Sequence, residues 1–270
     1  MRKQLVKTVT KLLEDDPRVV LLLGDIGVYG FREAFEKFPE RVYNIGILEQ
    51  ASVGVAAGLA IEGMVPIFHT IAPFLVERAL EQLKIDFGYQ GLGGNFISVG
   101  GSYDYAKLGC THHCPGDVQI LKTVPGTQIF IPGHPEEFNS ALLREYDNGK
   151  LNYFRLSETS NATYHLDGIV KHGKEGFVLA IGPMLDRVLD ACKDLDVTIE
   201  YSTNAKDAPS DAIVVEPFYK GTLGSPKSIG VPRRFITRYG TVSELDKHCG
   251  LTTNQIRERI KGFLYEPNNL

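Results

Sequence analysis

Residues 41–70, RVYNIGILEQASVGVAAGLAIEGMVPIFHT, indicate the fold more directly than any other stretch of the chain. Two short apolar segments, 41–46 and 65–70, flank a helical segment, 47–63, that closes on Gly63. This middle segment is rich in alanine and glycine, and such small residues let a helix pack closely against its neighbours. A strand, a helix and a second strand in this order predict a βαβ unit with parallel strands.

The same alternation continues on both sides of this unit. Short apolar segments predict further strands at 19–24, 95–100, 127–133 and 151–157. Apolar residues spaced by three and four predict helices at 1–16, 31–38, 73–87 and 135–149, the last two beginning on proline. Continuous apolar strands separated by helices predict an α/β fold with a mostly parallel sheet covered on both faces.

A second, smaller α/β unit follows the polar stretch 158–168. It is predicted from apolar segments at 177–182, 197–202, 212–217 and 233–240 and from helical segments at 184–195 and 252–264. The sequence therefore predicts two doubly wound domains, 1–165 and 170–270, with the boundary between 160 and 172.

Composition excludes several classes of function. A net charge of −4 and a pI near 6.0 give no reason to expect nucleic acid as a partner. No apolar run reaches the roughly 18 residues of a membrane span, and the amino terminus lacks the continuous apolar core of a signal peptide. The 4 cysteines do not form a disulfide framework. We therefore expect a cytoplasmic protein with no membrane partner.

Residues 109–114, GCTHHC, bring two cysteines and two histidines together. Closed zinc sites commonly use two ligand pairs that are a dozen or more residues apart, whereas these four side chains lie too close in sequence to surround a tetrahedral ion easily. Zinc binding is therefore the weaker interpretation. Both cysteines alternatively serve as small buried apolar residues.

Glu49 stands in the first turn of the predicted helix 47–63. A carboxylate at this position stabilises the start of a helix through the helix dipole. A carboxylate at the start of a buried helix is alternatively a group tuned for proton transfer. The residues alone leave both interpretations open.

The chain resembles the pyrimidine-binding domain of transketolases and 1-deoxyxylulose-5-phosphate synthases. The resemblance lies in NIGILEQ (44–50) with AAGLA (56–60), in GCTHH (109–113), in RALEQ (78–82) and in LGDI (23–26). The carboxy-terminal VPRRFITRYG and GLTTNQIRERI resemble the last domain of the same family. The matches run in order along nearly the whole chain.

The resemblance implies that thiamine diphosphate is the cofactor, bound across a subunit interface. Glu49 would hydrogen-bond N1′ of the aminopyrimidine and so help the 4′-nitrogen remove the proton from thiazolium C2. This role requires the acid form of a buried carboxyl group. Ile47 belongs to the same cofactor-binding segment, and Phe74, or Leu75 if the alignment shifts by one residue, would wall the pyrimidine.

Further residues follow from the same resemblance. Asp25 corresponds to an aspartate below the cofactor, and His112, a second catalytic residue, to a histidine near the 4′-amino group and the donor sugar. Alternative roles remain open for three positions: a turn residue for Asp25, core packing for Phe74, and a structural role in the loop for His113.

The resemblance also implies a missing half of the site. In the family, Mg²⁺ and the diphosphate are held by a GDG motif and an asparagine about thirty residues later. Their carboxylate and amide oxygens are the ligands that this ion prefers. The chain contains GDI at 24–26 and GDV at 116–118 but no GDG. We therefore expect the metal ligands to come from a separate amino-terminal transketolase-type subunit in an α2β2 heterotetramer.

The substrate-binding positions depart from the family pattern. The expected contacts with a sugar are His112, His113, Arg78, Tyr29 and Glu158, and Glu158 stands where the family usually has an arginine. A carboxylate repels a phosphate, so we expect at least one substrate to lack a terminal phosphate there, as a free or nucleotide-linked sugar does.

Three functions are consistent with the sequence. The first is a transketolase-like transferase subunit that moves a two-carbon ketol unit between sugars. The second is a subunit of a thiamine diphosphate enzyme that decarboxylates a 2-oxo acid and transfers the acyl group. The third is a non-catalytic interaction subunit of the same fold, which the presence of Glu49 and His112 disfavours.

Overall fold

The computed structural model describes residues 1–265 and divides them into two compact units. Unit 1 comprises residues 1–101, 120–130 and 138–158, and unit 2 comprises residues 102–119, 131–137 and 159 onward. Two short segments from the first half of the sequence thus pack with the second half. The single boundary predicted between 160 and 172 did not include these two earlier segments in the second domain.

Unit 1 contains a six-stranded parallel sheet in the order β2-β1-β3-β4-β6-β5. Its strands are β1 (Val19–Leu23), β2 (Val42–Asn44), β3 (Val65–Ile71), β4 (Gly94–Val99), β5 (Gln128–Phe130) and β6 (Leu151–Arg155). Its helices are α1 (Arg2–Asp15), α2 (Arg32–Lys37), α3 (Glu49–Ile61), α4 (Ala72–Val76), α5 (Leu80–Gln82), a π-helix (Leu83–Tyr89) and most of α7 (Pro135–Glu145), which begins in unit 2. The parallel sheet expected from the sequence is confirmed.

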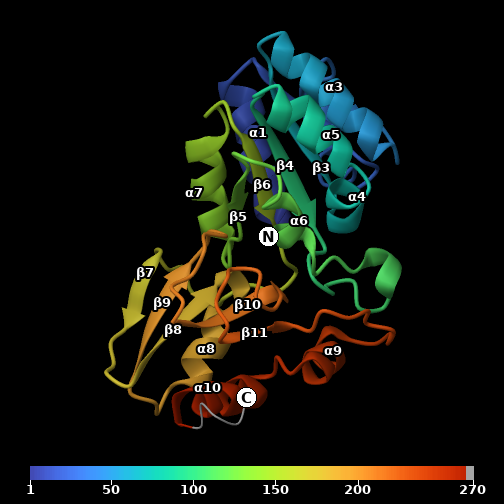
Figure 1. The fold of residues 1–270 in the computed structure, drawn as a ribbon. Helices are drawn as coiled ribbons and strands as arrows, with labels where there is room; N and C mark the ends of the chain where they lie inside the picture. The colour runs from blue at the N-terminus through green and yellow to red at the C-terminus, as the bar shows by residue number, and fades with distance from the viewer. Residues whose placement is uncertain (266–270) are drawn as a thin grey trace. The chain divides into compact units, whose positions relative to one another are not determined.

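Helices cover both faces of this sheet (Figure 1). The apolar sides of α1 and α7 form one core with the residues of β1, β3, β4 and β6 that face them. On the other face, Phe87 of the π-helix packs edge-on against Phe96 of β4, with 4.8 Å between ring centroids, and α3 packs along β3. Burial on both faces explains why the strands are apolar without alternation.

One predicted helix is interrupted. The segment 73–87 forms α4, α5 and the π-helix instead of one continuous helix. The Arg78 N–H donates to the carbonyl of Pro73, which widens the turn, and Ala79 leaves helical geometry with φ −110° and ψ 21°. Apolar spacing alone cannot reveal this break, because the same residues stay on the buried side.

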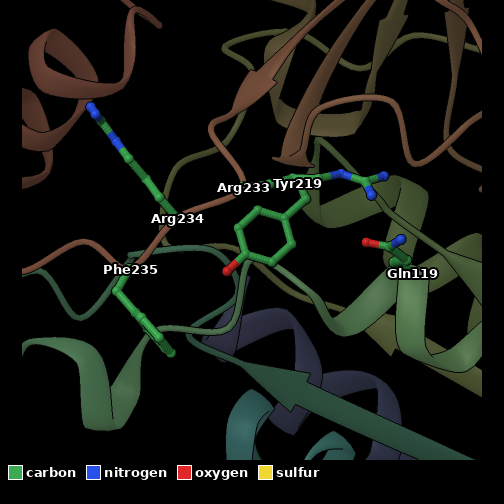
Figure 2. A pocket seen from close by; sticks show the side chains of 5 residues that line it. All are labelled: Gln119, Tyr219, Arg233, Arg234 and Phe235. Carbon is green, nitrogen blue, oxygen red and sulfur yellow. The ribbon is translucent and has the colours of Figure 1, made fainter.

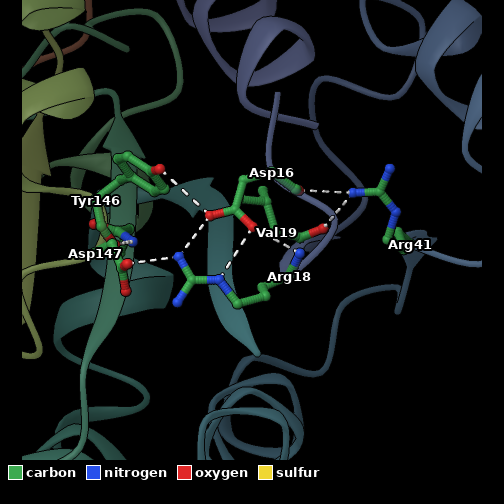
Figure 3. Close-up of polar contacts among 7 residues, drawn as sticks. Asp16, Arg18, Val19, Arg41, Tyr146 and Asp147 are labelled. Carbon is green, nitrogen blue, oxygen red and sulfur yellow. Dashed lines mark hydrogen bonds and ion pairs between the residues drawn. The ribbon is translucent and has the colours of Figure 1, made fainter. Parts of the chain in front are cut away.

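A polar network ties the amino end of β1 to neighbouring segments (Figure 3). Arg18 pairs with Asp16 at 2.7 Å and with Asp147 at 2.6 Å, and Arg41 donates to the carbonyls of Asp16 and Val19. Hydrogen bonding from Arg18 lowers the pKa of Asp16. These charged groups lie at the amino end of β1, far from the carboxyl ends of the strands. We therefore interpret the network as stabilising unit 1.

Unit 2 contains a five-stranded mixed sheet in the order β11-β10-β8-β9-β7. Its strands are β7 (Gly168–Lys171), β8 (Gly176–Ile181), β9 (Val197–Ser202), β10 (Ile213–Tyr219) and β11 (Ser228–Val231). Its helices are α8 (Leu185–Ala191), α9 (Val242–Cys249) and α10 (Thr253–Tyr265), with α6 (Asp117–Leu121) beginning in this unit. Only β7 runs antiparallel to its neighbour.

The strand expected at 233–240 is wrong. The last strand of the sheet is β11, which ends at Val231 before Pro232, and residues 233–240 contain no strand. Helix α9 was not predicted from the sequence, although it begins with a capping box. The Thr241 side chain accepts from the Glu244 N–H, and the Glu244 carboxylate accepts from the Thr241 N–H. The pattern TVSE at 241–244 is a readable signal for this helix start.

Candidate active site

The carboxyl ends of β1, β2 and β3 lie side by side at one edge of the first sheet. The chain leaves β1 toward β2 on one side and returns to β3 on the other, which makes the gap between β1 and β3 a topological switch point. Ligands of open parallel sheets bind at such points. Asp25, Glu49 and Phe74 all follow these three strands within a few residues.

Asp25 is fixed by Asn44, which was not among the predicted site residues. Asn44, at the end of β2, accepts from the Asp25 N–H through Oδ1 and donates to the Asp25 carboxylate through Nδ2, both at 3.0 Å. Asp25 has a φ of 57°, a left-handed conformation that aspartate tolerates better than most residues. Asn44 is a short polar residue within the predicted strand 41–46, at the end of β2, and this position could have identified it as a candidate site residue.

Glu49 begins α3 and is completely buried. Its Oε2 accepts from Nη1 of Arg78 at 2.6 Å, whereas its Oε1 has no hydrogen-bond partner within the described residues. A buried carboxylate oxygen without a partner is costly unless a ligand or another chain supplies a donor. The geometry therefore fits a group that completes its hydrogen bonds when a ligand binds.

Arg78 links Glu49 to the aromatic ring expected to wall the pyrimidine. Its guanidinium carbon lies 4.2 Å from the centroid of the Phe74 ring. Leu75, the alternative wall residue, is fully buried in the core, whereas Phe74 is only partly buried. Of the two, Phe74 is the one that retains surface for a ligand.

Two other residues proposed for this unit are strongly exposed. Ile47 and its neighbour Leu48 expose 64% and 57% of their surface just before α3. Tyr29 is 82% exposed, and the Arg32 guanidinium lies 4.6 Å from its ring centroid. Apolar side chains so exposed beside a buried carboxylate are typical of a surface that another molecule covers.

Glu158 is paired in a way that the sequence did not suggest. Its Oε1 accepts from Nη2 of Arg2 at 3.1 Å, and both side chains are about half-exposed. They line a cavity of about 220 Å³ together with Met1, Val99 and Ser157. The negative charge of Glu158 is therefore partly offset by a nearby arginine.

The GCTHHC loop belongs to unit 2. Cys110–His112 form one turn of 3-10 helix, and Nδ1 of the partly buried His112 lies 2.9 Å from the Thr111 hydroxyl. The ring of Tyr239 packs against Gly109, which has a φ of 74°, so that an added Cβ would clash with the tyrosine ring. Both the backbone conformation and this contact require glycine.

His113 follows His112 but is buried in unit 2. In the described chain neither of its ring nitrogens has a hydrogen-bond partner. Burial lowers the pKa of His113, with a smaller contribution from the charge of His112. The more accessible His112 is therefore better placed than His113 to meet a substrate from solvent.

A second cavity, of about 420 Å³, lies in unit 2. It is lined by Gln119, Tyr219, Arg233, Arg234 and Phe235 (Figure 2). The Tyr219 N–H donates to the carbonyl of Pro115 at 2.8 Å, which ties this cavity to the segment that follows the two histidines. In Figure 2 the two arginine side chains extend in opposite directions from the loop that follows β11.

The cysteines do not gather around the two histidines. Cys110 is exposed and Cys114, Cys192 and Cys249 are buried as free thiols. Between residues 1 and 265, no group of three or more His, Cys, Asp or Glu side chains is arranged to hold a metal ion. In the same range, every helix is too short or too polar to cross a membrane.

Comparison with known proteins identifies the family. Residues 1–162 match the family described as transketolase, pyrimidine binding domain. Over 95% of this chain and 92% of its relative, the sequence is 38% identical to the "Uncharacterized 33.6 kDa protein in fasciation locus" of Rhodococcoides fascians. It is also 34% identical, over 97% of both chains, to a protein of Phocaeicola vulgatus that is named as one subunit of an apulose-4-phosphate transketolase.

More distant similarities agree with this result. The 1-deoxy-D-xylulose-5-phosphate synthase of Geobacillus thermodenitrificans is 26% identical over 96% of this chain, which spans 48% of that enzyme. A solved structure titled "Split gene transketolase, inactive beta4 tetramer" has a TM-score of 0.81 and 22% identity, with 97% of both chains covered. That likeness shows a shared fold, and with the family match it shows that this chain belongs to the transketolase family through its pyrimidine-binding domain.

Proposed function

We propose that this chain is the pyrimidine-binding subunit of a split, thiamine diphosphate-dependent transketolase that transfers a two-carbon ketol unit between sugars. The observation that carries the proposal is the buried Glu49, whose unpartnered Oε1 lies at the carboxyl edge of a parallel sheet beside a partly exposed aromatic ring. The Phocaeicola vulgatus relative, which is named as one subunit of a transketolase, supports the division into two chains.

The residues of unit 1 fit the aminopyrimidine half of the cofactor. Glu49 would hold a proton at N1′, Phe74 would stack on the pyrimidine ring, and Asp25, fixed by Asn44, would lie at the same edge of the sheet. When bound, thiamine diphosphate supplies the nucleophilic carbon that accepts and donates the two-carbon unit. His112 would contact the donor sugar.

The partner is a separate amino-terminal transketolase-type subunit carrying the GDG motif and its asparagine. It would hold Mg²⁺ and the diphosphate through oxygen ligands, and two copies of each chain would form an α2β2 assembly. The exposed apolar side chains of Ile47, Leu48, Val55 and Ile61, at and along α3, support a large apolar contact with another chain.

The isolated chain is expected to bind thiamine diphosphate weakly and to be inactive, because this proposal places the metal and diphosphate ligands in the partner. Calorimetry on the full chain with Mg²⁺ present checks this expectation. Micromolar, Mg²⁺-dependent binding would contradict the division of the site between two subunits.

A second reaction is supported by the similarity to 1-deoxy-D-xylulose-5-phosphate synthase. The chain would then serve a 2-oxo acid decarboxylating synthase of the same cofactor class. Assaying the reconstituted pair with ketose donors and, separately, with pyruvate distinguishes the two reactions. Turnover of ketoses without release of carbon dioxide from pyruvate supports the transketolase.

Replacing Glu158 by arginine is expected to favour phosphorylated aldose acceptors over unphosphorylated ones. The substitution puts a second cation beside Arg2, where the wild-type chain has an ion pair. The measurement is the ratio of kcat/KM for a matched pair of acceptors. Glu158→Gln, which only removes the charge, should produce a smaller change in the same direction.

Arg2→Gln is the matched variant for this cavity, because it removes the arginine that pairs with Glu158 and should shift the ratio the opposite way. The relative from Phocaeicola vulgatus is itself named for a phosphorylated sugar, so use of a phosphorylated substrate is the competing outcome. A large wild-type preference for a five-carbon aldose phosphate would disprove the proposal that this position avoids phosphate.

A further inference from the structure

The Arg78 guanidinium makes two contacts that together outline a small, flat binding site. Its Nη1 donates to Oε2 of Glu49 at 2.6 Å, and its central carbon lies 4.2 Å from the centroid of the Phe74 ring. A guanidinium is planar, delocalised and rich in N–H donors. A flat nitrogen heterocycle stacked on Phe74 and hydrogen-bonded to Glu49 would occupy the same place as the guanidinium.

The two partners of this ion pair differ in freedom of movement. Glu49 is fully buried at the start of α3, and its Oε1 has no partner in the described part of the chain. The Arg78 side chain is 38% exposed and starts from the interruption between α4 and α5. A long, partly exposed side chain changes rotamer rapidly, so Arg78 can move out while Glu49 stays in place.

We propose that Arg78 is an internal ligand that fills the aminopyrimidine site of the unliganded chain, an inference that rests on the proposed function. The cofactor ring must displace the guanidinium before it stacks on Phe74 and meets Glu49. Because the site is competent only when Arg78 has left, the apparent affinity for the ring falls by the fraction of time that Arg78 is away.

Displacement also changes the surroundings of Glu49. Beside Arg78 its carboxyl group is held in an ion pair at 2.6 Å. When Arg78 leaves, Oε2 loses this partner, and Oε1 already has none in the described part of the chain. A ligand that hydrogen-bonds Glu49 would then replace the lost contact.

The test uses the full chain and thiamine, which carries the aminopyrimidine without the diphosphate. We expect Arg78→Gln to bind thiamine at least about tenfold more tightly than the wild-type chain in ligand-detected NMR titrations. Arg78→Lys keeps the charge but cannot lay a flat group on Phe74, so a smaller gain is expected. Arg32→Gln is the matched control, because Arg32 stacks on the exposed Tyr29 ring without contacting Glu49.

Thiamine binding that is equal in the wild type, Arg78→Gln and Arg78→Lys would overturn the internal-ligand proposal and leave the proposed function intact.

One more outcome separates the two proposals. If none of the chains binds thiamine at millimolar concentration, the internal-ligand proposal is overturned. The proposed function is judged separately, by the turnover of the reconstituted pair with a ketose donor.

Discussion

Replacing Glu49 by glutamine is expected to lower the turnover of the assembled enzyme by at least about 10²–10⁴-fold, the range typical of losing a general acid–base group. Glutamine keeps the size of the side chain, and its carbonyl oxygen still accepts a hydrogen bond from Arg78. It cannot give a proton to a ring nitrogen and take it back. The fold and assembly should therefore survive while the chemistry slows.

The measurement is kcat of the reconstituted pair with a ketose donor, together with the melting temperature of each variant. Glu62→Gln is the matched control, because Glu62 is an exposed carboxylate at the far end of the same helix, and it should leave kcat unchanged. A Glu49→Gln enzyme with near-normal kcat would remove Glu49 from the mechanism.

The second large effect concerns the stability of unit 2 and comes from Glu216. This side chain is fully buried in β10, and its Oε1 accepts from the Gly221 N–H at 2.6 Å and from the Ser228 hydroxyl. Its Oε2 has no hydrogen-bond partner within residues 1–265. Burial raises the pKa of Glu216 to about 7, although the hydroxyl of Ser228 and the N–H groups of 221–223 act in the opposite direction.

A carboxyl group whose pKa is raised by folding stabilises the protein only while it is protonated. The contribution of Glu216 to the free energy of unfolding is fully present below the ordinary pKa of glutamate. This contribution is lost as the pH rises through about 7. With about 1.4 kcal/mol for each unit of pKa difference, the wild type should lose about 2–3 kcal/mol relative to Glu216→Gln between about pH 5 and about pH 8.

Denaturant unfolding of both proteins across this pH range measures the difference in the free energy of unfolding. Glu258→Gln serves as the control, because its side chain is 71% exposed on α10 and should show no such pH-dependent difference. A difference between wild type and Glu216→Gln that stays constant with pH would show that Glu216 does not titrate on unfolding in this range.

The sequence predicted the parts of the fold that depend on local pattern. Apolar strands such as 19–24 and the amphipathic helix at the amino terminus appear close to where their periodicity placed them. The strand expected at 233–240 failed because Phe235, Ile236 and Tyr239 are residues typical of strands, whereas Pro232 follows β11 and removes a backbone donor.

Contacts between distant residues could not be predicted in this way. Glu49 and Arg78 are 29 positions apart, and their pairing depends on the widened turn after α4. The pairing of Arg2 with Glu158 spans 156 positions and modifies the charge argument made from Glu158 alone. Residue type identified the candidate groups, but their partners became visible only in three dimensions.

The contacts of the GCTHHC loop also determine when this loop can reach its folded conformation during protein synthesis. The Tyr103 hydroxyl, just before the loop, bonds to Asp246, 143 positions later, and Gly109 rests against Tyr239. A ribosome adds roughly 5–20 residues per second, so the loop leaves the ribosome many seconds before these partners exist. Strands β1 to β6 can pair earlier, but His112 reaches its folded position only when synthesis is nearly complete. A chain released before Tyr239 and Asp246 would contain both proposed catalytic residues, with Glu49 at the start of α3 beside a formed sheet but His112 not yet held in its folded position.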